Sequence, residues 1–496
     1  MSRMSFLSNG SKWVRFIALG TIAIGAGALI AVSPMIFMAL LAALIFLFVG
    51  FLSLKKFFLV ILFLIPFLPA LNLAPGMDVA SARPLILLLF ALFIVRGAVR
   101  RELKIPVNTG ALLVFAFLAW TTLSLLYSSA PDRTARKLMV FLSIFPLFFV
   151  VYGLHKRYGH ALTRSIFFAV GISALVASML GIVQFGLQFV LGGDAVVSIY
   201  SKIVAPVLWG ITTAKTIEMN PSWYFNAGSM DILRAFSSFP DPHVFSYFLS
   251  FGLPVQVAIA VLSERKVEKA IFYLSGALSL VAVFLTFSRG GYIGLVAGVL
   301  FAICCVVLKN NENKLQTMGK VALVTGIIVL GVASSPNPIS NRFASMFDVY
   351  EGSNQGRIKI WREAYEVFQN NPLLGAGLGA YSFEVKPSAD YREPIYAHNL
   401  YLELLAETGL PGFLLWISVM AISGYTCMRI FFSATKKRAV TALALLTTIV
   451  WFSVHSFFEM PVYSPVILPL LITVLAIISY WSQEEGRSKN QVADGF

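Results

Sequence analysis

Charged side chains are scarce in this sequence. Asp, Glu, Lys and Arg make up 12% of the 496 residues, whereas hydrophobic residues make up 58%. A soluble domain with so little polar surface would not stay dispersed in water, so the composition excludes an ordinary soluble protein. The mean hydropathy of +0.82 points the same way. We therefore expect an all-α, polytopic membrane protein.

Cysteine is almost absent as well. The three cysteines, Cys304, Cys305 and Cys427, lie inside or at the ends of apolar segments. This number and placement argue against a disulfide framework and a cysteine metal site, and they favour small core residues. A cleavable signal peptide is not expected either, because the first apolar run is long enough to span a membrane.

Long apolar runs are the main feature that is present. About 20 apolar residues cross a hydrocarbon core of roughly 30 Å, and by this measure we expect about 14 spans, or about 12–14 because several runs are short or contain Pro. The runs are Trp13–Val32, Pro34–Leu54, Phe57–Leu73, Pro84–Val95, Gly110–Tyr127, Leu138–Leu154, Leu162–Leu191, Val244–Leu262, Ala270–Phe287, Tyr292–Leu308, Val321–Ala333, Gly412–Met428, Ala439–Val454 and Ser464–Tyr480.

The net charge of +15 is an orientation signal. With the N-terminus in the cytoplasm, most Lys and Arg residues fall in cytoplasmic segments, as the positive-inside rule requires. Both termini are then cytoplasmic, and no nucleic-acid partner is expected. The basic segments besides the two termini are Lys55–Lys56, Arg96–Lys104, Lys156–Arg157, Arg265–Lys269, Lys309–Lys320 and Arg429–Arg438.

Two outward segments, Gly192–His243 and Pro336–His398, are too long to be simple connections. Loops of more than about 15 residues are usually functional or disordered, and these contain too many aromatic residues for disorder. We expect the working site between these loops and the outer ends of the helices. The predicted division is 1–191, an N-terminal bundle; 192–243, a first large outer loop; 244–335, central spans; 336–411, a second large loop; and 412–496, C-terminal spans and a cytoplasmic tail.

The second loop contains a predicted helix over 353–368, which Pro372 ends. With Ser353 or Asn354 as N-cap, Arg357 would lie in the first turn. A cation there opposes the helix dipole by about 0.3–1 kcal/mol, so a bound phosphate between Arg357 and the free amides would explain it. The alternative is a solvated arginine that tolerates the cost.

The segment Pro372–Ala380 is rich in glycine. It superficially resembles a nucleotide-binding loop, but no strand precedes it and no Lys-Ser/Thr follows it. A tight glycine turn that lets the backbone approach a helix or ligand is the preferred interpretation.

A histidine follows at the outer boundary of the membrane. Asn399 is predicted to cap a short helix that Gly409 and Pro411 close. His398 comes just before that cap, where an imidazole can titrate near neutral pH and accept a proton from a hydroxyl. A histidine that is merely hydrogen-bonded at an interface is the alternative.

Two further arginines are candidates. Arg289 lies at the outer junction of two spans, where a charge is costly and marks function by default. Arg234 precedes the next span, and both could instead be snorkelling residues. Converging guanidinium groups suit a diphosphate, which they grip bidentately without a metal.

The order of these motifs resembles the O-antigen ligase and polymerase superfamily over roughly Arg234–Pro411. The motifs are Ser-Arg289-Gly-Gly, Gly-Arg357-x-x-x-Trp361, Pro-Leu-Leu-Gly-x-Gly and His398-Asn-x-Tyr-Leu-x-x-Leu-x-Glu-x-Gly. The resemblance implies a metal-independent, GT-C-like glycosyltransferase of the bacterial inner membrane, without a cofactor. It would take a glycan from undecaprenyl diphosphate on the periplasmic face and pass it to an acceptor sugar.

The resemblance also implies roles for single residues. Arg289 and Arg357 match the family's essential arginines and His398 its essential histidine, with Arg234 a weaker match. The arginines would stabilise the departing diphosphate and His398 would deprotonate the acceptor hydroxyl, which predicts inversion. The outer loops contain no Asp-x-Asp, so no metal site is expected. The substrate-binding set would comprise Arg234, Arg289, Arg357, Trp361, Tyr401 and Glu403, and Glu403 is also a candidate for orienting His398.

The acceptor remains open between two members of the superfamily. A polymerase is favoured because Gly192–His243, with Trp209, Trp223, Tyr224 and Phe225, could form a second sugar-stacking surface. A ligase would deliver the glycan to lipid A–core or a protein. A transporter of lipid-linked glycan is a different class, but the chain shows no internal repeat of the kind transporters have. Expected partners are the lipid-linked donor, a saccharide acceptor and membrane lipids, and a chain-length regulator is left open.

Overall fold

A computed structural model describes residues 53–74, 77–101, 103, 106–211, 214–215, 223–226, 231–310, 319, 352–388 and 395–493. Met1–Phe58 and Leu59–Phe496 form separate compact units, and the account below concerns the second. Three expected spans, Trp13–Val32, Pro34–Leu54 and Val321–Ala333, lie outside the described residues, apart from the last two residues of the second.

The described chain is mostly helical and contains two short β-hairpins. The predominance of helices agrees with the expected all-α membrane protein. The helices are α3 (Leu54–Leu64), α4 (Ala82–Arg100), α5 (Thr109–Leu123), α6 (Pro131–Ile144), α7 (Pro146–Tyr158), α8 (His160–Leu191), α9 (Gly193–Ile199), a π-helix (Tyr200–Val204), α10 (Ala205–Leu208), α12 (Pro242–Leu262), α13 (Lys266–Leu285), α14 (Arg289–Asn310), α17 (Gly352–Asn370), α18 (Tyr381–Val385), α19 (Leu400–Ser433), α20 (Lys436–His455) and α21 (Ile467–Ala493). The strands β1 (Ala70–Ala74) and β2 (Met77–Ala80) pair antiparallel, as do β3 (Tyr224–Asn226) and β4 (Asp231–Leu233).

Ten helical stretches within the described ranges are long and apolar enough to cross a membrane, counting α6 and α7 as one. They correspond to ten of the expected runs. The expected span Phe57–Leu73 is wrong in its length: α3 has 11 residues, a 3-10 turn with Pro66 follows, and strand β1 begins at Ala70. Proline near the start of that turn and the pairing of β1 with β2 end the helix early.

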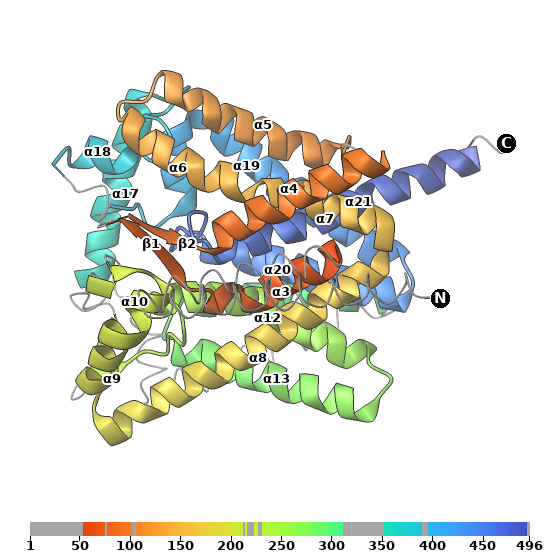
Figure 1. Cartoon of the computed structure of the whole chain (residues 1–496), viewed down its shortest axis with the longest axis horizontal. Helices are drawn as coiled ribbons and strands as arrows, with labels where there is room; N and C mark the ends of the chain where they lie inside the picture. The colour runs from red at the N-terminus through yellow and green to blue at the C-terminus, as the bar shows by residue number, and fades with distance from the viewer. Residues whose placement is uncertain are drawn as a thin grey trace, which may run out of the picture. The chain divides into compact units, whose positions relative to one another are not determined.

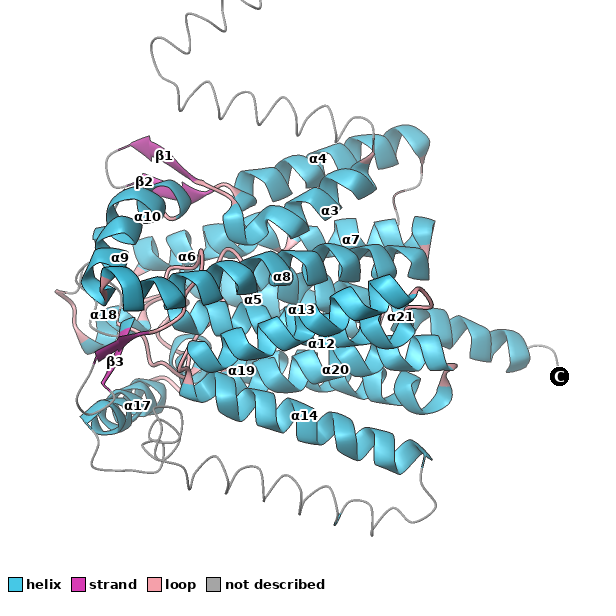
Figure 2. Ribbon diagram, turned by 90° about the horizontal axis from the view of Figure 1, so that it is seen from below, coloured by secondary structure: helices cyan, strands magenta, loops and turns pink. Residues whose placement is uncertain are grey.

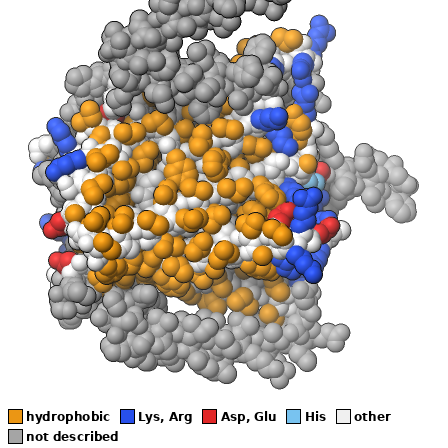
Figure 3. Space-filling view, turned by 60° about the horizontal axis from the view of Figure 1, so that its bottom comes forward, with side chains coloured by type: hydrophobic (Ala, Val, Ile, Leu, Met, Phe, Trp, Pro, Cys, Tyr) orange, Lys and Arg blue, Asp and Glu red, His pale blue; other side chains and the backbone are white. Residues whose placement is uncertain are grey.

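The spanning helices pack side by side, with α12 in the interior (Figures 1 and 2). Helix α12 contacts α8, α13 and α20, and 83% of its apolar window is buried. Helix α4 is its opposite, with 22% of its window buried, so most of its apolar surface faces outward. Figure 3 shows the resulting apolar belt, which is what helices in contact with lipid present.

The two ends of the bundle differ in charge. Helices α13 and α20 begin with Lys266 and Lys436, and α14 ends beside Lys309. Lys and Arg gather at this end in Figure 3. The opposite end contains the starts of α12, α14 and α19 and the ends of α13 and α20, and α9 and α17 lie across it (Figure 1). The candidate residues are at this second end.

Candidate active site

A buried carboxylate, Glu459, organises the site. Its Oε1 lies 2.8 Å from Nη2 of Arg357 and 3.5 Å from Nδ1 of His243, and its Oε2 lies 2.9 Å from Nδ1 of His398. Arg357 also donates through Nη1 to the carbonyl of Phe458 at 2.8 Å. Three cationic or titratable side chains from distant parts of the sequence therefore meet on one carboxylate.

The end of α20 positions this carboxylate. Helix α20 stops at His455, and the N–H of Phe458 donates to the His455 carbonyl, so that a tight turn presents Glu459 just beyond the helix. The N–H of Leu400 donates to the Ser456 carbonyl at 2.9 Å, which ties the start of α19 to the same turn. The residues before α19 are thereby held against Glu459.

His398 has a strained backbone. Its φ of 46° lies in the left-handed region, which costs a residue with a side chain about 1–3 kcal/mol and is typical of functional sites. The surrounding structure enforces it: the Asn399 side chain accepts the N–H of Tyr401 and caps α19, and Glu403 accepts the N–H of Ala397 at 3.0 Å. The predicted cap is confirmed, and the histidine is fixed from both sides.

Arg234 is buried, with 2% of its surface exposed, so it is not a snorkelling residue. Its Nε donates to the Thr286 carbonyl at 2.8 Å, and its Nη2 lies 3.4 Å from Nε2 of His243. A guanidinium only donates, so Nε2 of His243 accepts and its Nδ1 carries the proton. That Nδ1 lies 3.1 Å from Oγ of Ser288, which lies 3.4 Å from Nε2 of His455.

Arg289 begins α14 immediately after Ser288. The next residue, Gly290, is in close contact with the turn after α20. A Cβ on Gly290 would come within 2.6 Å of Cδ2 of His455 and 2.9 Å of Cβ of Phe458. Only glycine allows this approach, which brings the backbone of Arg289 to the turn that carries Glu459.

The ionisable side chains at this end of the bundle shift one another's pKa values. Burial alone would raise the pKa of Glu459, but His243, His398 and Arg357 together hold that pKa well below its ordinary value. Glu459 in turn raises the pKa of His398, and burial opposes this effect. Burial lowers the pKa of Arg234 to about 10, so Arg234 is still a cation at neutral pH. The site thus combines fixed positive charge with one ionised carboxylate.

Three other expected site residues, Tyr401, Glu403 and Trp361, make their contacts with groups other than Glu459. The Tyr401 hydroxyl donates to the Ser453 carbonyl at 2.7 Å, and its ring packs on Phe457 at 4.4 Å, so Tyr401 is bound into the packing of α19 against α20. Glu403 contacts the backbone before His398, whereas the imidazole itself is paired with Glu459. Trp361 lies half-buried on α17, and its indole N–H has no partner among the described residues.

The glycine segment forms the predicted turn. Gly375, Gly377 and Gly379 have φ of 72°, 105° and 77°. The N–H of Gly377 donates to the Glu407 carbonyl at 2.9 Å, and a Cβ on Gly375 would lie 2.5 Å from the Glu407 carbonyl carbon. The segment covers the place where α19 is interrupted at Gly409, so the preferred interpretation is confirmed.

Two sequence expectations need correction. Helix α17 begins at Gly352, so Ser353 and Asn354 lie inside it rather than before it. Arg357 is therefore past the first turn, and its position is explained by Glu459 instead of by a phosphate on free amides.

The aromatic residues of the first outer loop are the second correction. Trp223 is 1% exposed and packs on Tyr200 and Phe236 with ring centroids 5.4 Å and 4.1 Å away. Phe225 is 6% exposed and stacks on Phe287 at 5.0 Å. These rings belong to two small hydrophobic clusters, one around Trp223 within the loop and one that joins Phe225 to Phe287. Burying them in these clusters is more favourable than exposing them to water. Trp223 and Phe225 are not available for stacking on a sugar.

Sequence reasoning missed Glu459, His243, Ser288 and His455. Glu459 carried a usable signal, because it is a lone carboxylate between two apolar spans, flanked by Phe458 and Met460. Ionisable residues in such segments are functional candidates by default. The contacts of His243 and Ser288 depend on the packing of α12, α14 and α20, which no local pattern reports.

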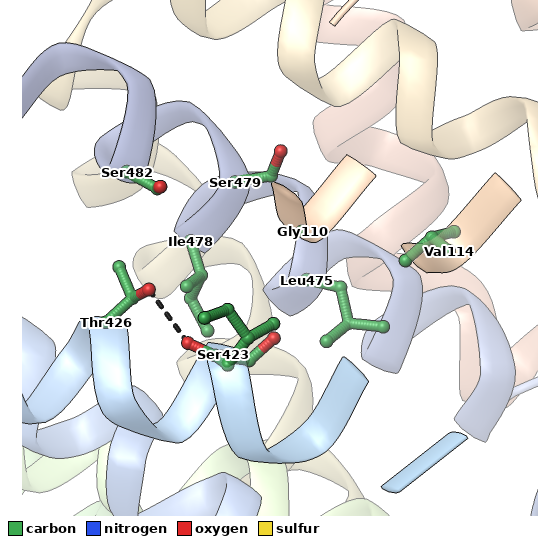
Figure 4. Close-up of a pocket in the computed structure, with 9 residues that line it drawn as sticks. Gly110, Val114, Ser423, Thr426, Leu475, Ile478, Ser479 and Ser482 are labelled. Carbon is green, nitrogen blue, oxygen red and sulfur yellow. Dashed lines mark hydrogen bonds between the residues drawn. The ribbon is translucent and has the colours of Figure 1, made fainter. Parts of the chain in front are cut away.

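The structure also contains a small pocket remote from these residues. It is lined by hydroxyl-bearing and apolar side chains of α5, α19 and α21, including Ser423, Thr426 and Ser479 (Figure 4). Ser423 comes 14 residues after the interruption of α19 at Gly409, which corresponds to about 21 Å along a helix. This pocket is separate from the Glu459 site.

Within the described ranges, no group of His, Cys, Asp and Glu is arranged to hold a metal ion.

Residues 274–417 match a family model described as O-antigen ligase. No curated protein matches the chain. The matched region includes Arg289, Arg357 and His398, whereas Arg234 and Glu459 lie on either side of it. The match confirms the resemblance of this chain to the O-antigen ligase and polymerase superfamily.

Proposed function

We propose that the protein is a metal-independent, inverting membrane glycosyltransferase that moves a glycan from undecaprenyl diphosphate to an acceptor sugar. The observation that carries this proposal is the contact of His398 with Glu459, next to Arg357. It supplies a base and a cationic surface at one end of a membrane bundle. Those are the two elements that displacement of a diphosphate by a hydroxyl requires.

His398 acts as the general base. The Glu459 carboxylate accepts a hydrogen bond from the Nδ1–H group, so the neutral ring presents Nε2 as its acceptor. The side chain of His398 is 44% exposed, which leaves it accessible to a substrate hydroxyl. Glu459 orients the ring and stabilises the imidazolium that forms, as a buried carboxylate does in a hydrolase triad. General-base help of this kind is typically worth about 10²–10⁴-fold.

The guanidinium groups of Arg289 and Arg357 act on the leaving group. The acceptor oxygen forms a bond to the anomeric carbon as the bond from that carbon to the diphosphate oxygen breaks. The electron pair leaves with the lipid diphosphate, and the hydroxyl proton moves to Nε2 of His398. Negative charge grows on the diphosphate during this step, and preorganised arginines are most effective against charge that develops there.

The charge asymmetry of the bundle supports a periplasmic site. Lys266, Lys309 and Lys436 mark one end of the helices, and Glu459 is at the other. Basic residues favour the cytoplasmic side of a bacterial membrane. The site then faces the periplasm of the inner membrane.

Arg289→Ala is the decisive variant. We expect loss of glycan transfer in proteoliposomes supplied with undecaprenyl-diphosphate glycan, while the purified variant keeps its melting temperature. Arg164→Ala is the matched control, because Arg164 is 72% exposed at the opposite end. Full activity of Arg289→Ala would remove Arg289 from the mechanism.

EDTA tests the metal-free assignment. Transfer should continue at its full rate in EDTA, because the proposed groups that stabilise the diphosphate are arginines. Inhibition that Mg²⁺ or Mn²⁺ reverses would contradict this part of the proposal.

The acceptor needs its own measurement. The polymerase preference relied on exposed aromatic residues, and the burial of Trp223 and Phe225 removes much of that ground. Reconstitution with donor alone should yield a ladder if the enzyme polymerises repeat units, whereas a single product that requires lipid A–core indicates a ligase. Movement of labelled lipid across the bilayer without a new glycosidic bond would favour a transporter instead. A chain-length regulator would alter the ladder and not the bond formed.

A further inference from the structure

One helical segment at the site end of the bundle is apolar on two sides. Helix α9, the π-helix and α10 follow one another without a break over residues 193–208. Figure 1 shows α9 lying across the end of the spanning helices instead of along them. Most soluble helices in such a place would turn a polar face outward.

The outward face of this segment is hydrophobic. Ile199, Ile203, Val207 and Ile211 are exposed, Ile203 by 65%. Ile199, Ile203 and Val207 are spaced four residues apart within the unbroken helical stretch, so they form one row on its surface. Ile211 follows this stretch, beyond Gly210, whose φ is 91°. Lys202 is exposed beside that row. A row of β-branched apolar side chains next to one lysine is unsuited to water but suited to a lipid boundary.

The inward face is hydrophobic as well. Val196, Tyr200 and Ala205 are buried in a cluster with Trp223 and Phe236. The outward row is therefore not a misplaced core face, because the segment already has a core to pack on. Its apolar exterior needs a second partner.

The exposed row follows the lipid-facing end of α8 along the chain. The last three residues of α8, Phe189, Val190 and Leu191, are all exposed, Val190 by 80%. Four small or acidic residues, 192–195, separate this surface from the buried Val196, and the exposed row begins three residues later, at Ile199. The chain thus leaves the apolar belt and keeps an apolar exterior, which identifies lipid as the second partner.

We propose that residues 199–211 form an interfacial membrane-binding element at the site end of the bundle. The isoleucine and valine row lies among the acyl chains of the adjacent leaflet, and Lys202 lies at the level of the lipid phosphates. The segment rests in the membrane surface and does not span it. This inference does not depend on the proposed enzymatic activity.

The element has a consequence for the site if the proposed function holds. Its inward face packs on Phe236 and Trp223, and the Trp223 carbonyl accepts the N–H of Arg234 at 2.9 Å. Anchoring the segment in the headgroup region therefore also sets the depth of Arg234. A lipid diphosphate has its charge at that same depth.

Site-specific fluorescence tests the element directly. Ile203→Cys and Val207→Cys are each made in a chain whose Cys304, Cys305 and Cys427 are replaced by alanine, labelled with an environment-sensitive dye and reconstituted in phosphatidylcholine vesicles. We expect blue-shifted emission that doxyl-labelled lipid quenches and aqueous iodide does not. Lys386→Cys, on an exposed polar stretch of the second loop, is the matched control and should show the reverse.

Two results would overturn the proposal. Quenching of the Ile203 label by iodide to the same extent as the Lys386 label would place the row in water. Protection of the Ile203 label from both quenchers would mean that protein covers it, either a second copy or another part of the chain.

A measurement on the unaltered chain avoids dependence on the cysteine-free background. Vesicles containing a lipid with a photoreactive acyl chain are irradiated, and the protein is digested with trypsin. Cleavage after Lys202 and Lys215 releases a peptide that begins at Ile203 and includes Val207 and Ile211. Lipid adducts on this peptide support the element; adducts on the spans with none on this peptide contradict it.

Discussion

Nδ1 of His398 lies 2.9 Å from Oε2 of Glu459, although 61 residues separate them in the sequence. The contact fixes which ring nitrogen carries the proton and holds the strained backbone of His398 in a single orientation. The same carboxylate accepts from Arg357 at 2.8 Å. Glu459 therefore links the proposed base to one of the proposed diphosphate-binding arginines.

Glu459→Gln should lower the transfer rate by about 10²–10⁴-fold, because an amide neither fixes the tautomer nor stabilises an imidazolium. The pH profile should also move. Glu459 raises the pKa of His398, and His398 works as a base only when neutral, so the rate rises with pH through that pKa. Without the carboxylate the pKa falls, and the acidic limb of kcat/KM should shift to lower pH.

The matched control for that variant is Glu484→Gln, which removes a carboxylate paired with Arg438 at the opposite end. Its pH profile should coincide with that of the unaltered protein. An unshifted acidic limb in Glu459→Gln would show that the titrating base is a different group.

Glu403 is a positioning residue for His398, because it accepts the N–H of Ala397 and does not contact the imidazole in the structure. Glu403→Gln keeps an acceptor there and should retain most of kcat. Glu403→Ala leaves a buried N–H without its partner, at a cost of about 1–3 kcal/mol, and should lower kcat more than it raises KM. Equal losses in the two variants, measured by initial rates, would indicate a role for the charge instead.

Arg234→Met should destabilise the protein. The substitution keeps much of the side-chain volume but leaves the Thr286 carbonyl and the His243 ring without the guanidinium donor. Each buried group left unsatisfied costs about 1–3 kcal/mol. The melting temperature in detergent should fall clearly. An unchanged value would mean that water replaces the guanidinium at no cost.

Gly409→Ala tests the interruption of α19. Gly409 has φ of 64°, and a Cβ there would lie 2.3 Å from the Leu373 carbonyl oxygen. With ψ of −174°, this backbone conformation is open essentially to glycine alone and costs alanine about 1–3 kcal/mol, before the clash is counted. We expect a lower melting temperature and reduced transfer, because the turns before Gly409 carry the residues next to His398.

Gly424→Ala on the same helix is the control, since its Cβ would make ordinary contact with Leu446 at 3.8 Å. Alanine is the better helix former, so this variant should be neutral or slightly more stable. Similar losses in both variants would mean that α19 tolerates no added methyl group anywhere.

Local patterns were sufficient for the elements of the fold. Asn399 was recognised as a cap, the glycines of Pro372–Ala380 as a turn, and Gly409 as an interruption, because each depends on a few neighbouring residues. The pattern failed at Phe57–Leu73, where hydropathy does not distinguish a short helix and strand from a span. It also failed at Trp223, because aromatic content does not report which face of a loop is buried.

The sequence by itself determined the membrane class of the protein and the approximate positions of most spans, and it predicted Arg289, Arg357 and His398 as site residues, since hydropathy and motif order are local properties. Only the tertiary structure decided that Glu459 joins Arg357 to His398 and that Arg234 is buried against His243. Those contacts arise where helices far apart in the chain end at the same edge of the bundle. Their partners are chosen by packing and by the cost of burying a charge alone, and no sequence spacing encodes either.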